Sequence, residues 1–287
     1  MLKLSFLLFV VIVLVGCQKE ISDFSPVDNT SCKTTKIYSE VISNEMGQID
    51  TYRDTLQFFY QNNMLERIHS SGGDIVLQYQ DSLVVKLTAY SDYQNPITEW
   101  GYYSISYQPG NLIASIDTRI RSASGYDPYS TFQYFFNTGD SVPSRSFSVW
   151  EYDLNGNPVE GTVDSLYYTF SNSNLVKYIQ KNLDPINGFE ETHEFTYNSK
   201  PNMAFSACPE LLWTFILYDF HLINDRLSAI LFSKNELAHW KNNLEDIDVN
   251  YTYNTQSGRL TSLTMAGSFD LNFVTGSIKF TIDSSCQ

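Results

Sequence analysis

The stretch "FFYQNNMLERI", residues 58 to 68, contains the pattern that decides the fold. Phe58 and Tyr60 alternate with other residues on the way to Asn62 and Asn63, a residue type that tolerates the backbone angles of a tight turn. An aliphatic pair then follows at Leu-x-x-Ile spacing. Alternating large side chains, a turn and a return run are typical of a β-hairpin with one covered face.

This hairpin design recurs along the chain. Similar units occupy residues 104 to 116, 167 to 179, 194 to 205 and 250 to 263, and looser copies occupy residues 75 to 87 and 132 to 144. A spacing of roughly 20 to 35 residues is the length of two strands and two turns. We therefore predict an all-β domain, a mainly antiparallel meander of repeated hairpins that forms a curved sheet or partial barrel. One face should be aromatic and covered, and the other should carry Ser, Thr, Asn and Lys.

A small helical insert is expected around residues 207 to 243, where the repeat is interrupted. Pro209 stands where a helix can begin, and apolar residues follow at helical spacing: Leu211, Leu212, Phe215 and Ile216. The segment 233 to 243 is predicted as a second short helical stretch or loop, with Trp240 as a core residue.

The unit at residues 250 to 263 resembles the YD-type repeats of a group of Bacteroidota lipoproteins that carry domains of unknown function. The residues that match stand in the expected order: Tyr251, Tyr253, Gly258, Arg259 and Leu260. A second segment, near residue 202, resembles the Asn-Pro-aromatic element of this group, although Asn202 follows Pro201 instead of preceding it. The likeness covers most of residues 50 to 285. It implies fold and location, and it transfers no catalytic residue.

The N-terminus has the features of an exported protein. After Lys3, an apolar segment of about a dozen residues is too short for a membrane-spanning helix, which needs roughly twenty. The segment ends in Leu-Val-Gly-Cys, which resembles the lipobox of bacterial lipoproteins. This resemblance implies a signal peptide at residues 1 to 16 and acylation of Cys17, whose acyl chains would hold the protein on a membrane. Residues 17 to 35 are then a flexible tether, and residues 36 to 287 are the folded domain.

The residues after Cys17 resemble a localisation signal. Gln18, Lys19 and Glu20 resemble the export signal of Bacteroidota surface lipoproteins, although Ile21 departs from its further acidic positions. The resemblance implies an outer-membrane protein that is held by lipid and faces the cell exterior.

Composition excludes several classes of function. The formal charge of −14 disfavours nucleic acid as a partner, because a surface of that sign repels phosphates. The four cysteines and four histidines show no zinc-ribbon or redox spacing, and no nucleophile elbow, phosphate loop or metalloprotease helix is present in the sequence. We therefore predict no catalytic residue, no metal site and no cofactor. A glycosidase-like carboxylate pair stays open, because such pairs leave no local spacing.

Three aromatic residues outside the repeat units are candidates for ligand binding: Trp100, Tyr102 and Tyr126. Exposed Tyr and Trp rings can stack on the apolar faces of sugar rings. Two polar clusters receive structural interpretations instead. The segment 153 to 157 is predicted as a hairpin turn, and strand alternation places Glu191 and His193 on the face of Phe195.

Three cysteines remain once Cys17 is acylated, namely Cys32, Cys208 and Cys286. An exported protein can form disulfides, and three pairings are open. A bond between Cys32 and Cys286 would join both ends of the domain, but it requires the first and last strands to be neighbours.

The sequence therefore favours a membrane-anchored, surface-exposed lipoprotein that serves as a binding or interaction module for a glycan or protein ligand. Two alternatives remain. One is a secreted, glycosidase-like hydrolase, and the other is a carrier of lipid or lipoprotein with an apolar cavity.

Overall fold

The computed structural model describes residues 32 to 286 apart from short gaps, the longest of which covers residues 215 to 228. Cys17, Gln18, Lys19 and Glu20 lie outside the described residues. The elements, in chain order, are β1 (Cys32–Glu45), β2 (Gln48–Gln61), β3 (Met64–Ser70), β4 (Gly73–Gln80), β5 (Leu83–Tyr90), the 3-10 turn η2 (Pro96–Thr98), β6 (Glu99–Gln108), β7 (Leu112–Ser122), β8 (Gly125–Phe136), β9 (Pro143–Val149), β10 (Val163–Ser171), β11 (Asn174–Asn182), β12 (Glu190–Pro201), β13 (Asn235–Lys241), β14 (Asp246–Tyr253), β15 (Leu260–Asp270) and β16 (Val274–Cys286).

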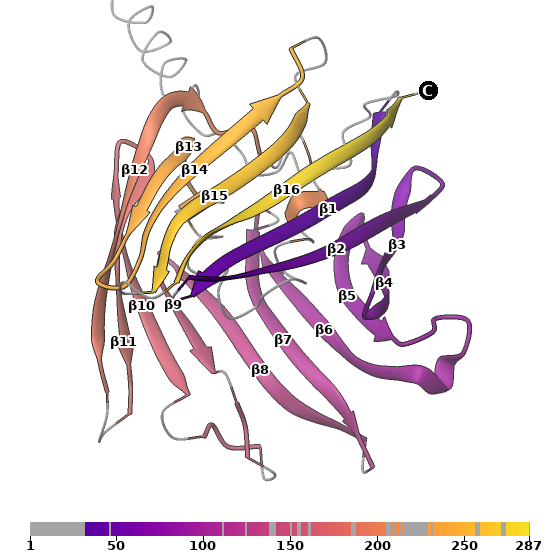
Figure 1. The fold of residues 1–287 in the computed structure, drawn as a ribbon. Coiled ribbons are helices and arrows are strands. Elements are labelled where there is room, and N and C mark those ends of the chain that lie inside the picture. Colours follow the sequence, from indigo (N-terminus) through magenta and orange to yellow (C-terminus); the bar gives the residue numbers. More distant parts are fainter. Residues whose placement is uncertain are drawn as a thin grey trace, which may run out of the picture.

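The strands form one closed antiparallel barrel (Figure 1). Each strand pairs with the next along the chain, and β1 pairs with β16 to complete the ring, with Ile37 opposite Ile282. The predicted all-β meander is confirmed. The sheet is closed, so the barrel has no unpaired edge strand.

The up-and-down order gives the barrel two distinct ends. The tether end holds Cys32, Cys286 and the connections that follow β2, β4, β6, β8, β10, β12 and β14. The distal end holds the connections that follow β1, β3, β5, β7, β9, β11, β13 and β15. In Figure 1, the tether end lies toward the top, on the side of the labelled C-terminus. The turns of the predicted repeat units fall at the tether end, except for the unit at 194 to 205, which forms no hairpin turn of its own.

The faces of the wall divide as the alternation predicts. Inward positions carry large apolar side chains, including Ile37, Phe58 and Leu263, which belong to one buried cluster. Outward positions on β1, β14 and β16 carry polar side chains, among them Lys36, Glu40, Asp246, Asp248, Asn250, Lys279 and Asp283. On these strands, therefore, the inner face is apolar and the outer face is polar.

β-Bulges explain the Leu-x-x-Ile spacing. In the pair of β2 and β3, Tyr60 lies opposite Leu65 and Phe59 lies opposite Arg67, so Glu66 is an extra residue. This extra residue lets Leu65 and Ile68, three positions apart, both point inward, with exposed fractions of 7% and 0%. Equivalent extra residues follow the other tether-end hairpin turns: Val85, Ala114, Ser144, Val176 and Thr261.

The repeated tyrosines join neighbouring hairpins inside the barrel. Tyr79 Oη donates to the Leu65 carbonyl at 2.7 Å, and Tyr107 Oη donates to the Val84 carbonyl at 2.8 Å. Tyr197 Oη makes the same bond to the Leu175 carbonyl at 2.6 Å. Each acceptor is a residue that follows the turn of an earlier hairpin, so the tyrosine of each unit fastens that unit to the wall before it.

The described residues of the insert between β12 and β13 pack against the inner face of the barrel. Described residues at 210 to 212 are helical, and Leu211 and Leu212 are buried in the same cluster as the inward-facing wall residues. Glu210 Oε1 accepts a hydrogen bond from Tyr60 Oη at 2.5 Å, which ties the insert to β2. Phe215 and Ile216 lie outside the described residues. Within the described ranges, no helix is both long and apolar enough to cross a membrane.

The helical or loop prediction for residues 233 to 243 is wrong, because this segment forms β13. The closed sheet needs a strand between β12 and β14, and these pairings override the weak local preference. Trp240 is buried, as predicted, and it lies opposite Phe195. The unit at 194 to 205 differs for the same reason: β12 runs on to Pro201 and pairs with β13 after the insert.

Candidate functional site

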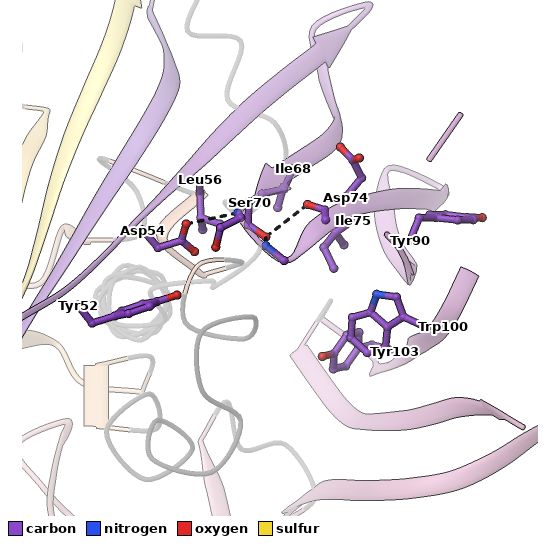
Figure 2. A pocket seen from close by; sticks show the side chains of 13 residues that line it. Tyr52, Asp54, Leu56, Ile68, Ser70, Asp74, Ile75, Tyr90, Trp100 and Tyr103 are labelled. Atoms are coloured by element: carbon purple, nitrogen blue, oxygen red, sulfur yellow. Dashed lines mark hydrogen bonds between the residues drawn. The ribbon is translucent and has the colours of Figure 1, made fainter. Parts of the chain in front are cut away.

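A cleft of about 230 Å³ opens on the inner wall of β2 to β6 at the distal end (Figure 2). Its lining includes four aromatic residues: Tyr52, Tyr90, Trp100 and Tyr103. Tyr52 is 57% exposed and Trp100 is 41% exposed, so both rings reach solvent. Leu56, Ile68 and Ile75 form the rest of the apolar lining.

The same cleft is lined by four polar residues, Asp54, Ser70, Ser71 and Asp74, and the side chains of Asp54 and Ser70 are held by the β3–β4 turn. Asp54 Oδ1 accepts bonds from the backbone N–H groups of Thr55 and Ser71, at 2.7 and 3.3 Å. Within the described part of the chain both bonds use Oδ1, which leaves Oδ2 for a ligand. Ser70 Oγ accepts a bond from the Gly72 N–H at 3.2 Å and donates to the Gly73 carbonyl at 3.3 Å. The β3–β4 turn thereby orients both polar groups.

A β-bulge aims Trp100 at the cleft. Ala89 pairs with Gly101 and Tyr90 pairs with Glu99, so Trp100 is the extra residue of β6. A bulged residue leaves the regular alternation of the strand, and such bulges commonly re-aim a side chain. Figure 2 shows the Trp100 ring beside Tyr103 on one side of the cleft, with Tyr52 on the other. Burial raises the pKa of the Tyr103 phenol, which therefore stays protonated and can act as a hydrogen-bond donor.

Gly73 allows the wall of the cleft to form. Its φ is +128°, and a Cβ at this position would lie 2.1 Å from the Tyr90 carbonyl oxygen. A side chain here would push β4 away from β5. The close approach of these strands thus requires glycine at the β3–β4 turn.

A cluster on the outer wall holds the β5–β6 connection in place. The Arg67 guanidinium lies between the rings of Phe59 and Tyr93, 3.8 and 4.2 Å from their centroids. Arg67 Nη1 also contacts Asp74 Oδ1 at 2.5 Å, and His69 Nδ1 lies 3.1 Å from the same oxygen. Because Tyr93 belongs to the segment that leads to Trp100, this cluster fixes the approach to the cleft from outside.

The structure separates the three predicted ligand-binding residues. Trp100 lines the cleft, but Tyr102 and Tyr126 contact each other on the outer wall, with ring centroids 5.0 Å apart. Lys86 lies over the Tyr102 ring at 4.1 Å, and Tyr126 Oη donates to Glu99 Oε1 at 2.6 Å. Tyr102 neighbours inward-facing Tyr103 in β6, so the alternation of the strand turns it away from the cleft.

Tyr52, Asp54 and Tyr103 were not predicted as site residues. Tyr52 and Asp54 could have been found from the alternation of inward and outward side chains along β2. Leu56, Phe58 and Tyr60 are the even-numbered inward residues, and the same parity places Tyr52 and Asp54 on the inner face. The closed sheet then brings β2 and β6 onto one wall, which no local pattern indicates.

The two polar clusters have the structural roles expected of them. Asp153 Oδ1 accepts a bond from the Asn157 N–H at 2.9 Å, and a bridge joins Tyr152 to Pro158 across the turn. His193 is buried against Tyr178, with ring centroids 4.2 Å apart, and accepts a bond on Nδ1 from Trp240 Nε1 at 3.2 Å. Desolvation raises the pKa of the neighbouring Glu191 carboxyl.

The closed barrel brings Cys32 and Cys286 opposite each other. They are direct register partners in the pair of β1 and β16, which meets the condition that the first and last strands be neighbours. Cys208 is a free, fully buried thiol in the insert, 3.5 Å from Thr34 Oγ1. Burial and the neighbouring Glu210 raise the pKa of the Cys208 thiol, so this residue is a poor nucleophile.

Among the residues that the structure describes, no group of three or more His, Cys, Asp or Glu side chains is arranged to hold a metal ion. The chemistry available in the cleft is therefore that of aromatic stacking, a carboxylate acceptor and a serine hydroxyl. This combination of apolar rings with a few oriented polar groups is typical of small-molecule sites.

Comparisons with known proteins add little to this description. No protein-family model matches the chain, and no curated protein matches it. Among solved structures, the chain is similar to a porin-like protein from Bacteroides vulgatus, at 8% sequence identity and a TM-score of 0.31, over 88% of this chain and 98% of that chain. A likeness at this TM-score leaves the function to be inferred from the barrel itself.

Proposed function

We propose that this protein is a lipid-anchored binding protein of the outer membrane and that its distal cleft holds a carbohydrate. The observation that carries the proposal is the pair of exposed rings, Tyr52 and Trp100, beside Asp54 at one end of a closed barrel. Aromatic rings cover the apolar faces of a pyranose, and a carboxylate accepts bonds from its hydroxyl groups. The YD-type and lipobox resemblances support the same location.

The outer wall of the barrel supports attachment by a lipid instead of insertion of the strands. Strands that cross a membrane present apolar side chains to the lipid, where a Lys or Arg at the midplane costs about 2 to 4 kcal/mol. Here Lys36, Glu40 and Lys279 point outward from adjacent strands, and apolar residues fill the interior. Such a wall is suited to water, so Cys17 would supply the contact with the membrane.

The position of the cleft supports display of the site. The tether would enter at Cys32, at one end of the barrel, and the cleft lies at the other end. A ligand from the medium would then meet Tyr52 and Trp100 first. The export-like residues Gln18, Lys19 and Glu20 agree with an outward-facing domain.

Binding to oligosaccharides tests the proposal directly. We expect a neutral hexasaccharide from a panel of plant and microbial glycans to bind the full chain, as measured by isothermal titration calorimetry. Trp100→Ala and Tyr52→Ala should each weaken binding at least about tenfold, as loss of a central aromatic contact commonly does.

Tyr126→Ala is the matched control, since Tyr126 is 40% exposed on the outer wall. It should bind like the wild type. The proposal fails if no glycan of the panel binds, or if Trp100→Ala and Tyr126→Ala bind equally well.

The two alternatives receive less support from the geometry. A glycosidase needs two carboxylates aimed at one bond, but of the two carboxylates that line the cleft, Asp74 is held on the outer wall by Arg67 and His69. A lipid carrier needs an empty apolar cavity. In this barrel, Leu211, Leu212 and Ile230 of the insert pack into the apolar interior.

A further inference from the structure

Charge is distributed unequally between the two ends of the barrel. At the tether end, the described residues that are exposed or half-buried are mostly basic: Lys33, Lys36, Lys86, Arg145, Lys177, Lys200, Lys234 and Arg259. The exposed or half-buried acidic residues described at this end are fewer: Glu66, Asp81, Asp117, Glu194 and Asp283. Among the described residues, the tether end therefore carries more basic than acidic side chains, in a chain whose formal charge is −14.

The distal end has the opposite sign. Its described acidic residues that reach solvent are Glu45, Asp50, Asp92, Glu99, Asp127, Glu151, Asp153, Asp184, Glu190, Glu245, Asp246 and Asp248. Basic residues here are Arg53, Arg119, Arg121, Lys181 and Lys241. Three of them have acidic neighbours: Arg53 Nε lies 2.6 Å from Glu40 Oε2, Lys181 Nζ lies 2.7 Å from Glu190 Oε2, and Lys241 Nζ lies 3.9 Å from Asp246 Oδ2. The barrel is thus polarised along its axis.

We infer that the basic tether end is a docking surface for an anionic lipid membrane. Lysine and arginine side chains near such a surface are attracted to its phosphates, and acidic side chains are repelled, within a Debye length of about 8 Å at physiological salt. The polarised barrel would therefore stand on its tether end, with the distal end directed away from the membrane. This inference rests on the proposed attachment by Cys17.

The tether by itself does not fix this orientation. The residues between Cys17 and Cys32 could span at most about 50 Å when fully extended, which permits many positions of the barrel. The acyl chains would hold the protein close to the membrane, and the charges then select which end faces it. Two exposed lysines at the tether end, Lys200 and Lys234, are well placed to make the contact.

Hydrogen exchange of the full lipidated chain on vesicles tests the orientation. On vesicles of phosphatidylcholine with 30 mol% phosphatidylglycerol (on the order of the anionic content at which such attraction is strong), amides of the turns around residues 172 and 234 should exchange more slowly. Amides of the distal turns around residues 71 and 123 should not change. On pure phosphatidylcholine, neither set should be protected, and high salt should remove the protection.

Two double variants of equal charge separate a specific surface from net charge. Lys200→Glu with Lys234→Glu alters the tether end, and Lys181→Glu with Lys241→Glu alters the distal end. In the Cys17→Ser chain, which lacks the acylation site, flotation with anionic vesicles at low salt should fall at least about tenfold for the tether-end pair and little for the distal pair. Circular dichroism checks that both variants fold.

The outcomes distinguish the two proposals. If the wild-type chain fails to stay on pure phosphatidylcholine vesicles, attachment by Cys17 fails, while the flotation of Cys17→Ser still tests the docking surface. If both double variants float equally, or if distal amides are the protected ones, the docking surface is wrong and the anchor is unaffected.

Discussion

At the residue scale, the tyrosines of the repeat have a double role. Their rings fill the interior beside the bulges, and their hydroxyl groups satisfy carbonyls of a neighbouring hairpin, as Tyr79 does for Leu65 and Tyr197 does for Leu175. A buried phenol of this kind resists ionisation, because the charged form would lose both water and its role as a donor. Burial raises the pKa of Tyr107 to about 12 and raises those of Tyr79 and Tyr197 further.

These raised pKa values predict that the barrel loses stability in alkali. An unfolded tyrosine ionises near pH 10, so the folded state holds more protons than the unfolded state above that pH. The contribution of Tyr107 is fully present below pH 10 and is lost as the pH rises toward about 12. Urea unfolding should give a constant free energy up to about pH 9 and a falling one above pH 10.

Tyr107→Phe isolates one of these residues. It should cost about 1 kcal/mol at neutral pH, because the bond to the Val84 carbonyl is lost, and it should make the alkaline fall less steep. A free energy of unfolding that stays constant from pH 9 to 11 would contradict the buried-tyrosine explanation.

At the element scale, each tether-end hairpin depends on its turn and its bulge together. Asn62 and Asn63 take positive φ values of 50° and 66°, the requirement of a two-residue turn that matches the twist of the strands. The bulge that follows then shifts the alternation by one residue. The turn residues can be recognised in the sequence. The Leu-x-x-Ile spacing is the feature of the sequence that corresponds to the bulge.

The pairing of β1 with β16 predicts a disulfide between Cys32 and Cys286. Directly opposite residues in an antiparallel pair are within reach of a disulfide, and the proposed export would place them in an oxidising compartment. Intact mass of the unreduced protein should be about 2 Da below that of the reduced protein, the mass of two hydrogen atoms lost per bond. Reduction should lower stability by roughly 2 to 4 kcal/mol, since the bond closes nearly the whole chain.

Matched variants test the pairing. Cys208→Ser should leave the mass difference in place, because Cys208 is a buried free thiol. Cys32→Ser should abolish it. The pairing is wrong if the unreduced chain contains three reactive thiols after unfolding.

The sequence predicted the hairpins that form the wall of the barrel and one residue of the cleft, Trp100. Alternation and turn residues are local, so the hairpins and the buried faces of Tyr251 or Trp240 could be predicted. Closure of the sheet depends on the pairing of β1 with β16, and the cleft forms between Tyr52 of β2 and Trp100 of β6. These arrangements bring together segments far apart in the chain, and no spacing in the sequence indicates them.

At the scale of the whole molecule, we propose that one end of the barrel serves attachment to the membrane and the other end serves ligand binding. In this proposal the tether end lies next to the anchor and carries the basic surface, and the distal end carries the aromatic cleft and the acidic surface. The cleft would then face the medium. If the barrel faced the periplasm, the same cleft would meet a different set of ligands.

Proteinase K added to intact cells tests the display. The wild-type domain should be digested, and a variant with Gln18, Lys19 and Glu20 all changed to Ala should become protected, because the three residues that resemble an export signal are gone. A known surface protein serves as the control for digestion. Protection of the wild type while that control is shaved would contradict surface display.

The seam between β1 and β16 has a consequence for the time course of folding. Each of the other pairs joins consecutive strands, so it can form as soon as its two strands are available. The seam instead joins residues 32–45 to residues 274–286. Contacts so distant in the chain form slowly, because the intervening loop must be closed first. Until that moment, β1 has a row of unpaired backbone groups that another copy could occupy. The newly made chain should therefore be most prone to aggregate just before its last strand is added.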